Sequence, residues 1–173
     1  MKSHSDFSRL ADLFGAGVTT IDSHTAGEAT RLIVAGFGPV AGRTMAEKLA
    51  SVKSGRDHLR ALLTREPRGS REIMAALLTP AVSAEARFGL IYMDARRYPY
   101  LCGHATIGAL VTLAKTGFLT LAEGENRVPV DTPSGLVEAG VSVRDGDDPK
   151  HYALLRVKHR RHQDGTAKAS EDE

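Results

Sequence analysis

Short blocks of apolar residues alternate along this chain with polar and glycine-rich stretches. The block 18–21 is β-branched throughout and predicts a strand, the block 30–35 predicts a second strand, and the polar stretch 22–28 between them predicts a loop. The apolar run 88–93 is nearly unbroken and of strand length, which predicts a buried strand. The run 73–78 fits a strand or a helix equally, because a short apolar run has no diagnostic period.

Two segments have the pattern of helices. Thr44 and Glu47 have the spacing of a capping box, in which a hydroxyl and a carboxylate satisfy backbone donors at a helix start. Apolar residues follow at helical spacing until Pro67, and Gly55 interrupts them, so we expect one helix or two shorter ones. The segment 104–116 is apolar nearly all round, which predicts a helix buried in the core.

The next apolar segments, 127–131 and 136–143, predict a β-hairpin. The sequence Thr-Pro-Ser-Gly at 132–135 fits a tight turn, since proline favours the second turn position and glycine the fourth. From residue 144 onward the chain is strongly charged, which predicts a disordered tail in which only 151–157 has the apolar content to pack.

These patterns divide the chain into three parts. Residues 1–16 have mixed character and predict a short helix or a loose N-terminal arm. Residues 17–143 hold the predicted strands and helices and have the length of one domain. Residues 144–173 are the predicted tail.

The composition argues against several classes of protein. The 173 residues are 42% hydrophobic and 25% charged, which is ordinary for a soluble globular protein. A net charge of +2 and the absence of tryptophan give no reason to expect a nucleic acid partner. No apolar run approaches the ~20 residues of a membrane span, and the N-terminus lacks the apolar core of a signal peptide. We therefore expect a soluble, cytoplasmic protein with no nucleic acid or membrane partner.

The one cysteine, Cys102, stands directly before the predicted helix 104–116. A single cysteine excludes an internal disulfide and a zinc site built from cysteines alone. Free N–H groups at a helix start lower the pKa of a thiol there, and they can also hold a carboxylate. Gly103 allows a ligand to approach the backbone closely, and His104 can donate a hydrogen bond or carry a positive charge. This pattern fits proton abstraction next to a carboxyl group, and the alternative is an inert, buried cysteine.

Three other interpretations of the polar residues remain open at this point. Cys102 and His24 can be the nucleophile and the base of a hydrolase. A metal can bind Asp22, His24 and Cys102, or the histidines of the basic run 156–162, but neither set has the spacing of a closed site, so we expect no metal. The basic run can also contact nucleic acid, although a solvated tail explains it better.

Several segments together resemble one enzyme family. The sequence CGHATIG, which begins at Cys102, resembles the first catalytic motif of the proline racemase family. That family includes proline racemases, hydroxyproline 2-epimerases and trans-3-hydroxyproline dehydratases. Four more segments resemble the family in the same order: 21–28, 66–69, 90–94 and 131–137. Order and spacing agree from about residue 19 to about residue 143, which is more specific than one short motif.

The resemblance implies an α+β fold similar to that of diaminopimelate epimerase. In this fold each of two similar lobes wraps a mostly antiparallel, mixed sheet around a central buried helix, and the substrate lies between the lobes. Residues 17–143 then form the first lobe.

The resemblance also implies a reaction, which is the removal and return of the α-proton of proline or a hydroxyproline without cofactor or metal. Cys102 is then the base or the acid of the first lobe, and Gly103 and His104 hold the substrate carboxylate and its surroundings. His24 and Thr25 are expected near the site. Proline and its 3- and 4-hydroxy derivatives all remain candidate substrates, and epimerase and dehydratase remain alternative activities.

The chain also departs from the family. It has no counterpart of the second lobe and no second cysteine, and the resemblance ends near residue 143, so we expect a truncated chain with little or no activity by itself. Inversion needs an acid and a base on opposite faces of the substrate, and one lobe supplies only one of them. Two alternatives follow: a non-catalytic remnant or small protein that binds carboxylates, and a homodimer in which two copies oppose their Cys102 residues.

Overall fold

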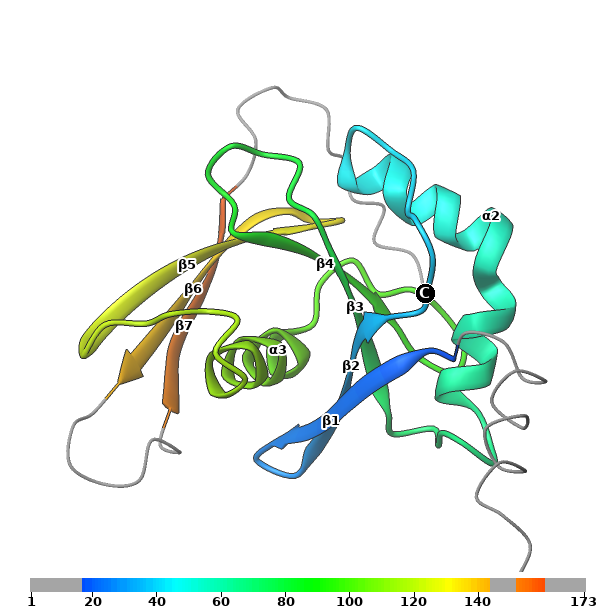
Figure 1. Ribbon diagram of the computed structural model, residues 1–173, viewed down its shortest axis with the longest axis horizontal. Coiled ribbons are helices and arrows are strands. Elements are labelled where there is room, and N and C mark those ends of the chain that lie inside the picture. Colours follow the sequence, from blue (N-terminus) through cyan, green and yellow to red (C-terminus); the bar gives the residue numbers. More distant parts are fainter. Residues whose placement is uncertain (1–16, 144–151, 161–173) are drawn as a thin grey trace, which may run out of the picture.

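The computed structural model describes residues 17–143 and, by backbone alone, 152–160 (Figure 1). The predicted arm at 1–16 and the tail segments 144–151 and 161–173 lie outside the described residues. The strands are β1 (Thr19–Thr25), β2 (Glu28–Ala35), β3 (Met74–Thr79), β4 (Phe88–Met93), β5 (Gly124–Thr132), β6 (Gly135–Val143) and β7 (Tyr152–Arg160). The helices are α2 (Met45–Thr64) and α3 (Gly103–Lys115).

The strands form one mixed sheet in the order β1-β2-β3-β4-β5-β6-β7. Pairs β2/β3 and β4/β5 are parallel, and the other four pairs are antiparallel. Each parallel pair needs a long crossover, and these crossovers contain the helices, α2 between β2 and β3 and α3 between β4 and β5. The sheet curls around α3 while α2 covers its outer face (Figure 1). The α+β fold with a mostly antiparallel sheet around a central helix is therefore confirmed.

The central strands are buried on both faces. Tyr92 of β4 belongs to the core around α3, together with Leu110 of the helix. Its neighbour Ile91 belongs to the core under α2, together with Val52. Successive strand residues point to opposite faces, so a strand between two cores is apolar at every position. This explains the nearly unbroken apolar run at 88–93 and confirms the prediction of a buried strand.

Both predicted helices are present. The Thr44 hydroxyl accepts a hydrogen bond from the Glu47 N–H at 3.1 Å, as predicted, while the Glu47 carboxylate accepts from the Arg43 N–H at 2.7 Å, one residue before the expected donor. Helix α2 bends at Arg56, which has non-helical backbone angles, next to the predicted interruption at Gly55. None of the described helices is long and apolar enough to cross a membrane.

The predicted loop at 22–28 is wrong over most of its length. Strand β1 continues to Thr25, because β2 pairs with it residue by residue down to Thr25 and Glu28. The turn consists of Ala26 and Gly27, which both have positive φ (51° and 95°), the backbone of a tight two-residue hairpin turn. Polar side chains on an edge strand hide such a strand from a hydrophobic pattern. The undecided run at 73–78 is strand β3, held between β2 and β4.

The prediction of disorder is wrong for part of the tail. The backbone of β7 pairs antiparallel with β6, from Leu136 and Arg160 to Val143 and Tyr152. An edge strand needs only backbone partners on one side, so a charged segment can join a sheet. Residues 152–157 of the predicted apolar segment 151–157 fall within this strand.

Candidate active site

Cys102 occupies the N-cap position of α3, as the sequence predicts. The chain leaves the buried strand β4 at Met93 and reaches Cys102 with an extended backbone (φ −144°, ψ 113°), which an N-cap residue requires. The thiol is half-buried, and the side chain makes no capping hydrogen bond to the helix. The sulfur therefore lies at the start of the helix.

The His104 side chain lies against the thiol. Its Nδ1 is 3.4 Å from the Cys102 sulfur and its Nε2 is 3.8 Å away, so the imidazole donates to or accepts from the thiol according to its tautomer. The backbone carbonyl of His104 accepts a hydrogen bond from the Thr25 hydroxyl at 3.0 Å. Thr25 thus ties the end of β1 to the start of α3, and the structure brings Cys102, His104 and Thr25 together.

Gly103, the first residue of α3, faces open space. Apart from its chain neighbours and the helix backbone, no described atom lies within 4 Å of the place where a Cβ on Gly103 would stand. A ligand can therefore approach the free N–H groups of the first helical turn at this point. This open space is compatible with the prediction that Gly103 helps to hold a carboxylate.

The electrostatic surroundings of the thiol differ from the prediction. Burial raises the pKa of Cys102 above its usual value, and the carboxylates of Glu28 and Asp94 raise it further. The backbone N–H groups of Ala105 and His104 lower this pKa, but burial is the largest single effect and the pKa is raised overall. The prediction of a lowered thiol pKa is wrong because the same packing that places the thiol at the helix start also removes it from water.

The structure does not bring His24 to the thiol. His24 and Thr25 are adjacent on β1, so their side chains point to opposite faces of the sheet. Thr25 faces α3, and the exposed ring of His24 lies on the other face, where its Nδ1 accepts the Gly27 N–H at 3.3 Å. Among residues 17–143 no contact joins His24 to Cys102, which leaves the hydrolase interpretation without a base from β1.

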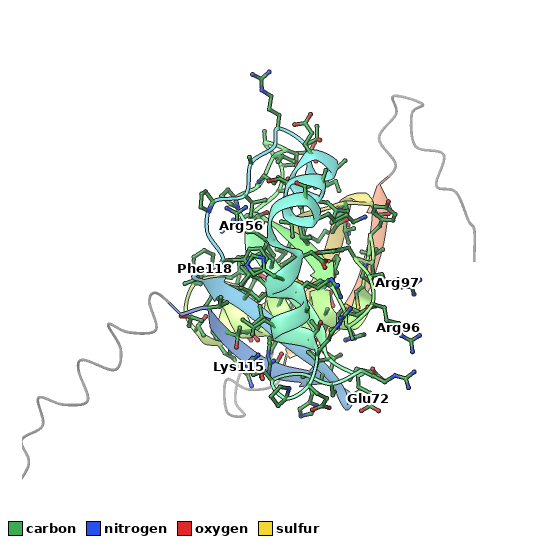
Figure 2. All side chains as sticks on the ribbon, turned by 90° about the vertical axis from the view of Figure 1, so that its right-hand side faces the viewer. Arg56, Glu72, Arg96, Arg97, Lys115 and Phe118 are labelled. Carbon is green, nitrogen blue, oxygen red and sulfur yellow. The ribbon has the colours of Figure 1, made fainter. Side chains whose placement is uncertain are left out.

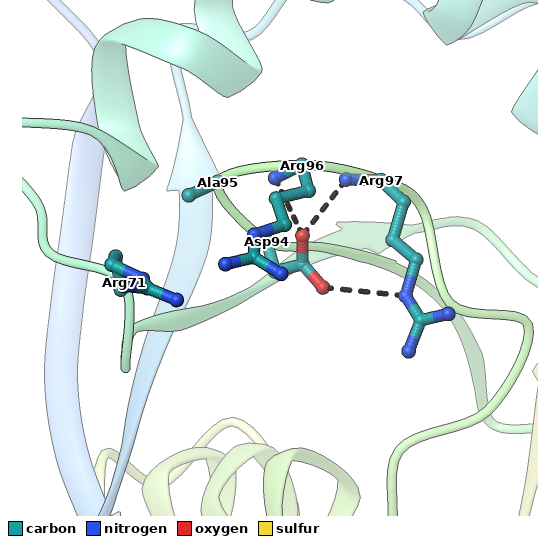
Figure 3. Close-up of a pocket in the computed structure, with 5 residues that line it drawn as sticks. All are labelled: Arg71, Asp94, Ala95, Arg96 and Arg97. Atoms are coloured by element: carbon teal, nitrogen blue, oxygen red, sulfur yellow. Dashed lines mark hydrogen bonds and ion pairs between the residues drawn. The ribbon is translucent and has the colours of Figure 1, made fainter.

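A pocket of about 420 Å³ lies beside the loop that leads from β4 to Cys102 (Figure 3). It is lined by Arg71, Asp94, Ala95, Arg96 and Arg97. The Asp94 carboxylate accepts the backbone N–H groups of Arg96 and Arg97 at 2.7 and 2.8 Å, which fixes the loop. In Figure 2, Arg96 and Arg97 lie on one side of the molecule, and Phe118, beyond the C-terminal end of α3, lies on the opposite side. Cys102 is not among the lining residues, so the pocket is separate from the thiol.

Sequence patterns missed two carboxylates that act on the thiol. Glu28 lies at the start of β2, and Asp94 follows β4 directly. An acidic residue at the carboxyl end of a buried strand is a signal that points to Asp94, whereas nothing local to Glu28 points to Cys102. Among residues 17–143 no three histidine, cysteine, aspartate or glutamate side chains are arranged to hold a metal ion.

Comparison with known proteins adds independent information. A family model described as proline racemase matches residues 20–164, so the match continues beyond residue 143, where the resemblance was wrongly expected to end. The proline racemase of Clostridioides difficile is 37% identical over 144 residues, which are 83% of this chain and 43% of the racemase. A 4-hydroxyproline epimerase of Burkholderia pseudomallei is 45% identical over 130 residues, which are 72% of this chain and 41% of the epimerase. The chain thus spans less than half the length of these curated relatives.

A solved structure agrees with these matches. The crystal structure of a hydroxyproline epimerase from Agrobacterium vitis with bound trans-4-hydroxy-L-proline superimposes with a TM-score of 0.68 at 28% identity. The superposition covers 73% of this chain and 37% of the epimerase. Since the family model matches most of the sequence and the lobe around α3 has the fold of a relative, the chain belongs to the proline racemase family.

Proposed function

We propose that this chain is the first lobe of a racemase or epimerase that moves the α-proton of proline or hydroxyproline, with Cys102 as its acid or base. The observation that carries the proposal is the half-buried thiol at the start of α3, next to the open space at Gly103. The substrate class is supported by the relatives, which are a proline racemase, a 4-hydroxyproline epimerase and an epimerase with bound trans-4-hydroxy-L-proline.

In this proposal the substrate carboxylate binds to the first turn of α3. The N–H groups there have no helical partner and carry partial positive charge, which favours an anion. Gly103 leaves space for it, and the His104 side chain stands beside the sulfur, where it can direct a hydrogen bond to the thiol or to the ligand. With its carboxylate held in this way, an amino acid presents its α-carbon to the Cys102 sulfur.

On one face of the substrate, the proton transfer needs only Cys102 and the groups that hold the carboxylate. The Cys102 thiolate removes the α-proton, so the Cα–H bond breaks, an S–H bond forms, and the released electron pair delocalises into the carboxylate. A second acid then returns a proton to the opposite face of the α-carbon. In the reverse direction, Cys102 is the acid that returns the proton.

Because its pKa is raised, the resting Cys102 thiol is protonated at neutral pH. This form is ready to act as the acid. To act as the base it must lose its proton, and the ammonium group of a bound amino acid, a cation close to the sulfur, favours that loss. We therefore expect exchange catalysed by Cys102 to rise with pH through the neutral range.

Inversion requires a second acid, and this sequence has a single cysteine. The second group comes either from polypeptide outside this sequence or from a second copy whose Cys102 faces the first. The described lobe by itself is therefore proposed to invert its substrate little or not at all. Sedimentation velocity separates the two sources, because a strict monomer at high concentration excludes the homodimer.

The test is α-proton exchange in deuterium oxide, followed by NMR. The folded chain is offered L-proline, trans-4-hydroxy-L-proline and trans-3-hydroxy-L-proline, with Cys102→Ser as the control. Exchange that disappears in Cys102→Ser supports the proposal, and the preferred substrate identifies the subgroup. Exchange with inversion indicates that two catalytic faces have assembled, and loss of water from the 3-hydroxy substrate indicates a dehydratase. No exchange from a folded chain contradicts the catalytic proposal and favours carboxylate binding without catalysis.

A further inference from the structure

A buried chain of hydrogen bonds leads from the centre of the sheet to the backbone of Cys102. The Tyr92 hydroxyl on β4 is 2.6 Å from the Thr106 hydroxyl on α3. The Thr106 hydroxyl is in turn 2.7 Å from the carbonyl oxygen of Cys102. Both Tyr92 and Thr106 have 0% exposed surface. The chain therefore joins the most buried strand to the residue that carries the thiol.

The available protons determine which group donates in each of these two hydrogen bonds. A carbonyl oxygen can only accept, so Thr106 donates its single hydroxyl proton to Cys102. Tyr92 must then be the donor to Thr106. Burial raises the pKa of Tyr92 well above its usual value, so the phenol keeps its proton at every pH at which the protein would be studied.

The two hydrogen bonds of the Thr106 hydroxyl fit one rotamer of this side chain. A threonine in a helix divides between two rotamers, one of which bonds the carbonyl four residues earlier. In the observed rotamer the carbonyl of Cys102 receives two bonds from Thr106, from its N–H at 3.0 Å and from its hydroxyl at 2.7 Å. These two hydrogen bonds anchor the backbone of Cys102 to the helix.

We propose that Tyr92 and Thr106 are positioning residues that hold the Cys102 backbone, and with it the thiol, against the N-terminus of α3. The inference rests on the proposed role of Cys102. Both side chains are fully buried and act through Cys102 without touching the substrate. Their effect on the thiol arises because the backbone N–H groups of His104 and Ala105 favour the thiolate only while the sulfur stays close to them.

The test uses the single cysteine as its own reporter. Alkylation of the full chain by iodoacetamide, measured from pH 6 to pH 10, reports the reactivity of Cys102 and requires no catalysis, and Cys102→Ser gives the background rate. The titratable groups that surround the thiol are Glu28, Asp94, His104 and Tyr92. Of these groups, only Tyr92 is changed in the variants. The effects of the other three groups on the alkylation profile are therefore the same in each variant.

Four variants separate positioning from general stability. Tyr92→Phe keeps the ring and removes the first hydroxyl, and Thr106→Val keeps the shape and removes the second. Thr106→Ser keeps the hydroxyl and is the conservative rescue. Tyr98→Phe is the matched control, because that hydroxyl is 3.0 Å from Asp57 and belongs to another network.

We expect Tyr92→Phe and Thr106→Val to move the alkylation profile to higher pH. Alkylation at pH 8 should slow about threefold to tenfold, which is the factor that corresponds to the net free energy of one hydrogen bond. Thr106→Ser and Tyr98→Phe should give the wild-type profile. The double variant Tyr92→Phe/Thr106→Val should be no slower than the worse single variant, since both hydroxyls act in one chain.

A wild-type profile for Tyr92→Phe in a folded protein would overturn the inference, whatever its stability. Tyr92→Phe decides the question by itself if Thr106→Val does not fold. The outcome is distinct from that of the proposed function, because loss of α-proton exchange leaves the alkylation profile measurable.

Discussion

Helix α3 packs so closely on the first hairpin that a single added methyl group should destabilise the lobe. At Gly108 an added Cβ would stand 3.0 Å from both Cβ and Oγ1 of Thr30, and 3.1 Å from the Ser23 hydroxyl. These distances are shorter than ordinary van der Waals contacts, and the two side chains face each other across β1 and β2. Gly108→Ala therefore forces α3, β1 or β2 to move.

The magnitude follows from two opposing effects. Alanine in a helix interior is favoured over glycine by about 1 kcal/mol. Overpacking a well-filled core costs about 1–3 kcal/mol, and here the methyl also meets hydroxyls that are buried and have no hydrogen-bond partner among residues 17–143. We expect a net loss of about 1 kcal/mol in the free energy of unfolding.

The same substitution at Gly55 is the matched control. Gly55 lies inside α2, and no atom of the described residues stands within 4 Å of an added Cβ there, apart from its neighbours and the helix backbone. Gly55→Ala should therefore stabilise the protein by about 0.5–1 kcal/mol. Urea unfolding followed by circular dichroism measures both variants against the wild type, with linear extrapolation to zero urea.

Opposite signs for the two variants support the packing argument, whereas stabilisation by Gly108→Ala refutes it. A second comparison locates the contact. Thr30→Ala removes the hydroxyl nearest to the added methyl, so Gly108→Ala should cost less in that background. Equal costs in both backgrounds would assign the strain to contacts other than the Thr30 hydroxyl, such as the Thr30 Cβ or the Ser23 hydroxyl.

Three simpler perturbations test other parts of the lobe in the same urea assay. Leu110→Ala should lower the free energy of unfolding by about 2–5 kcal/mol, because Leu110 is fully buried in the core around α3; a smaller loss than 1 kcal/mol would contradict that packing. Thr44→Ala should cost about 1 kcal/mol by removing the cap of α2, and Thr44→Ser should restore most of it. Arg60 and Tyr98 lower the pKa of Asp57 to about 2, below its value in the unfolded chain, so the stability it provides is present above about pH 4 and is lost as the pH falls toward 2. The Asp57 side chain is half-exposed, which limits this contribution to about 1 kcal/mol, and Asp57→Asn should flatten the stability curve between pH 4 and pH 2; an unchanged slope would assign acid sensitivity to other groups.

Local patterns predicted the elements whose residues have one dominant environment. Helix α3 is apolar nearly all round because the sheet curls around it, and β4 is apolar at each position because it lies between two cores. The polar end of β1 was not predicted, since its residues form a strand only by pairing with β2. The backbone of β7 was missed for the same reason, because an edge strand is specified by its neighbour.

The sequence by itself determined the position of the candidate site. The order Cys102, Gly103, His104 before an apolar helix places a thiol, an open backbone and an imidazole at one helix start, because these relations are local along the chain. The same local motifs carry the resemblance to the proline racemase family, which the family match establishes.

Only the tertiary structure decided how the thiol behaves. Its pKa depends on burial and on the carboxylates of Glu28 and Asp94, which reach it from other elements. Strand alternation turned His24 away and placed Thr25, 79 positions before His104 in the chain, against the helix start. Desolvation and Coulomb interactions depend on distance in space, and the folding of the sheet around α3 sets those distances.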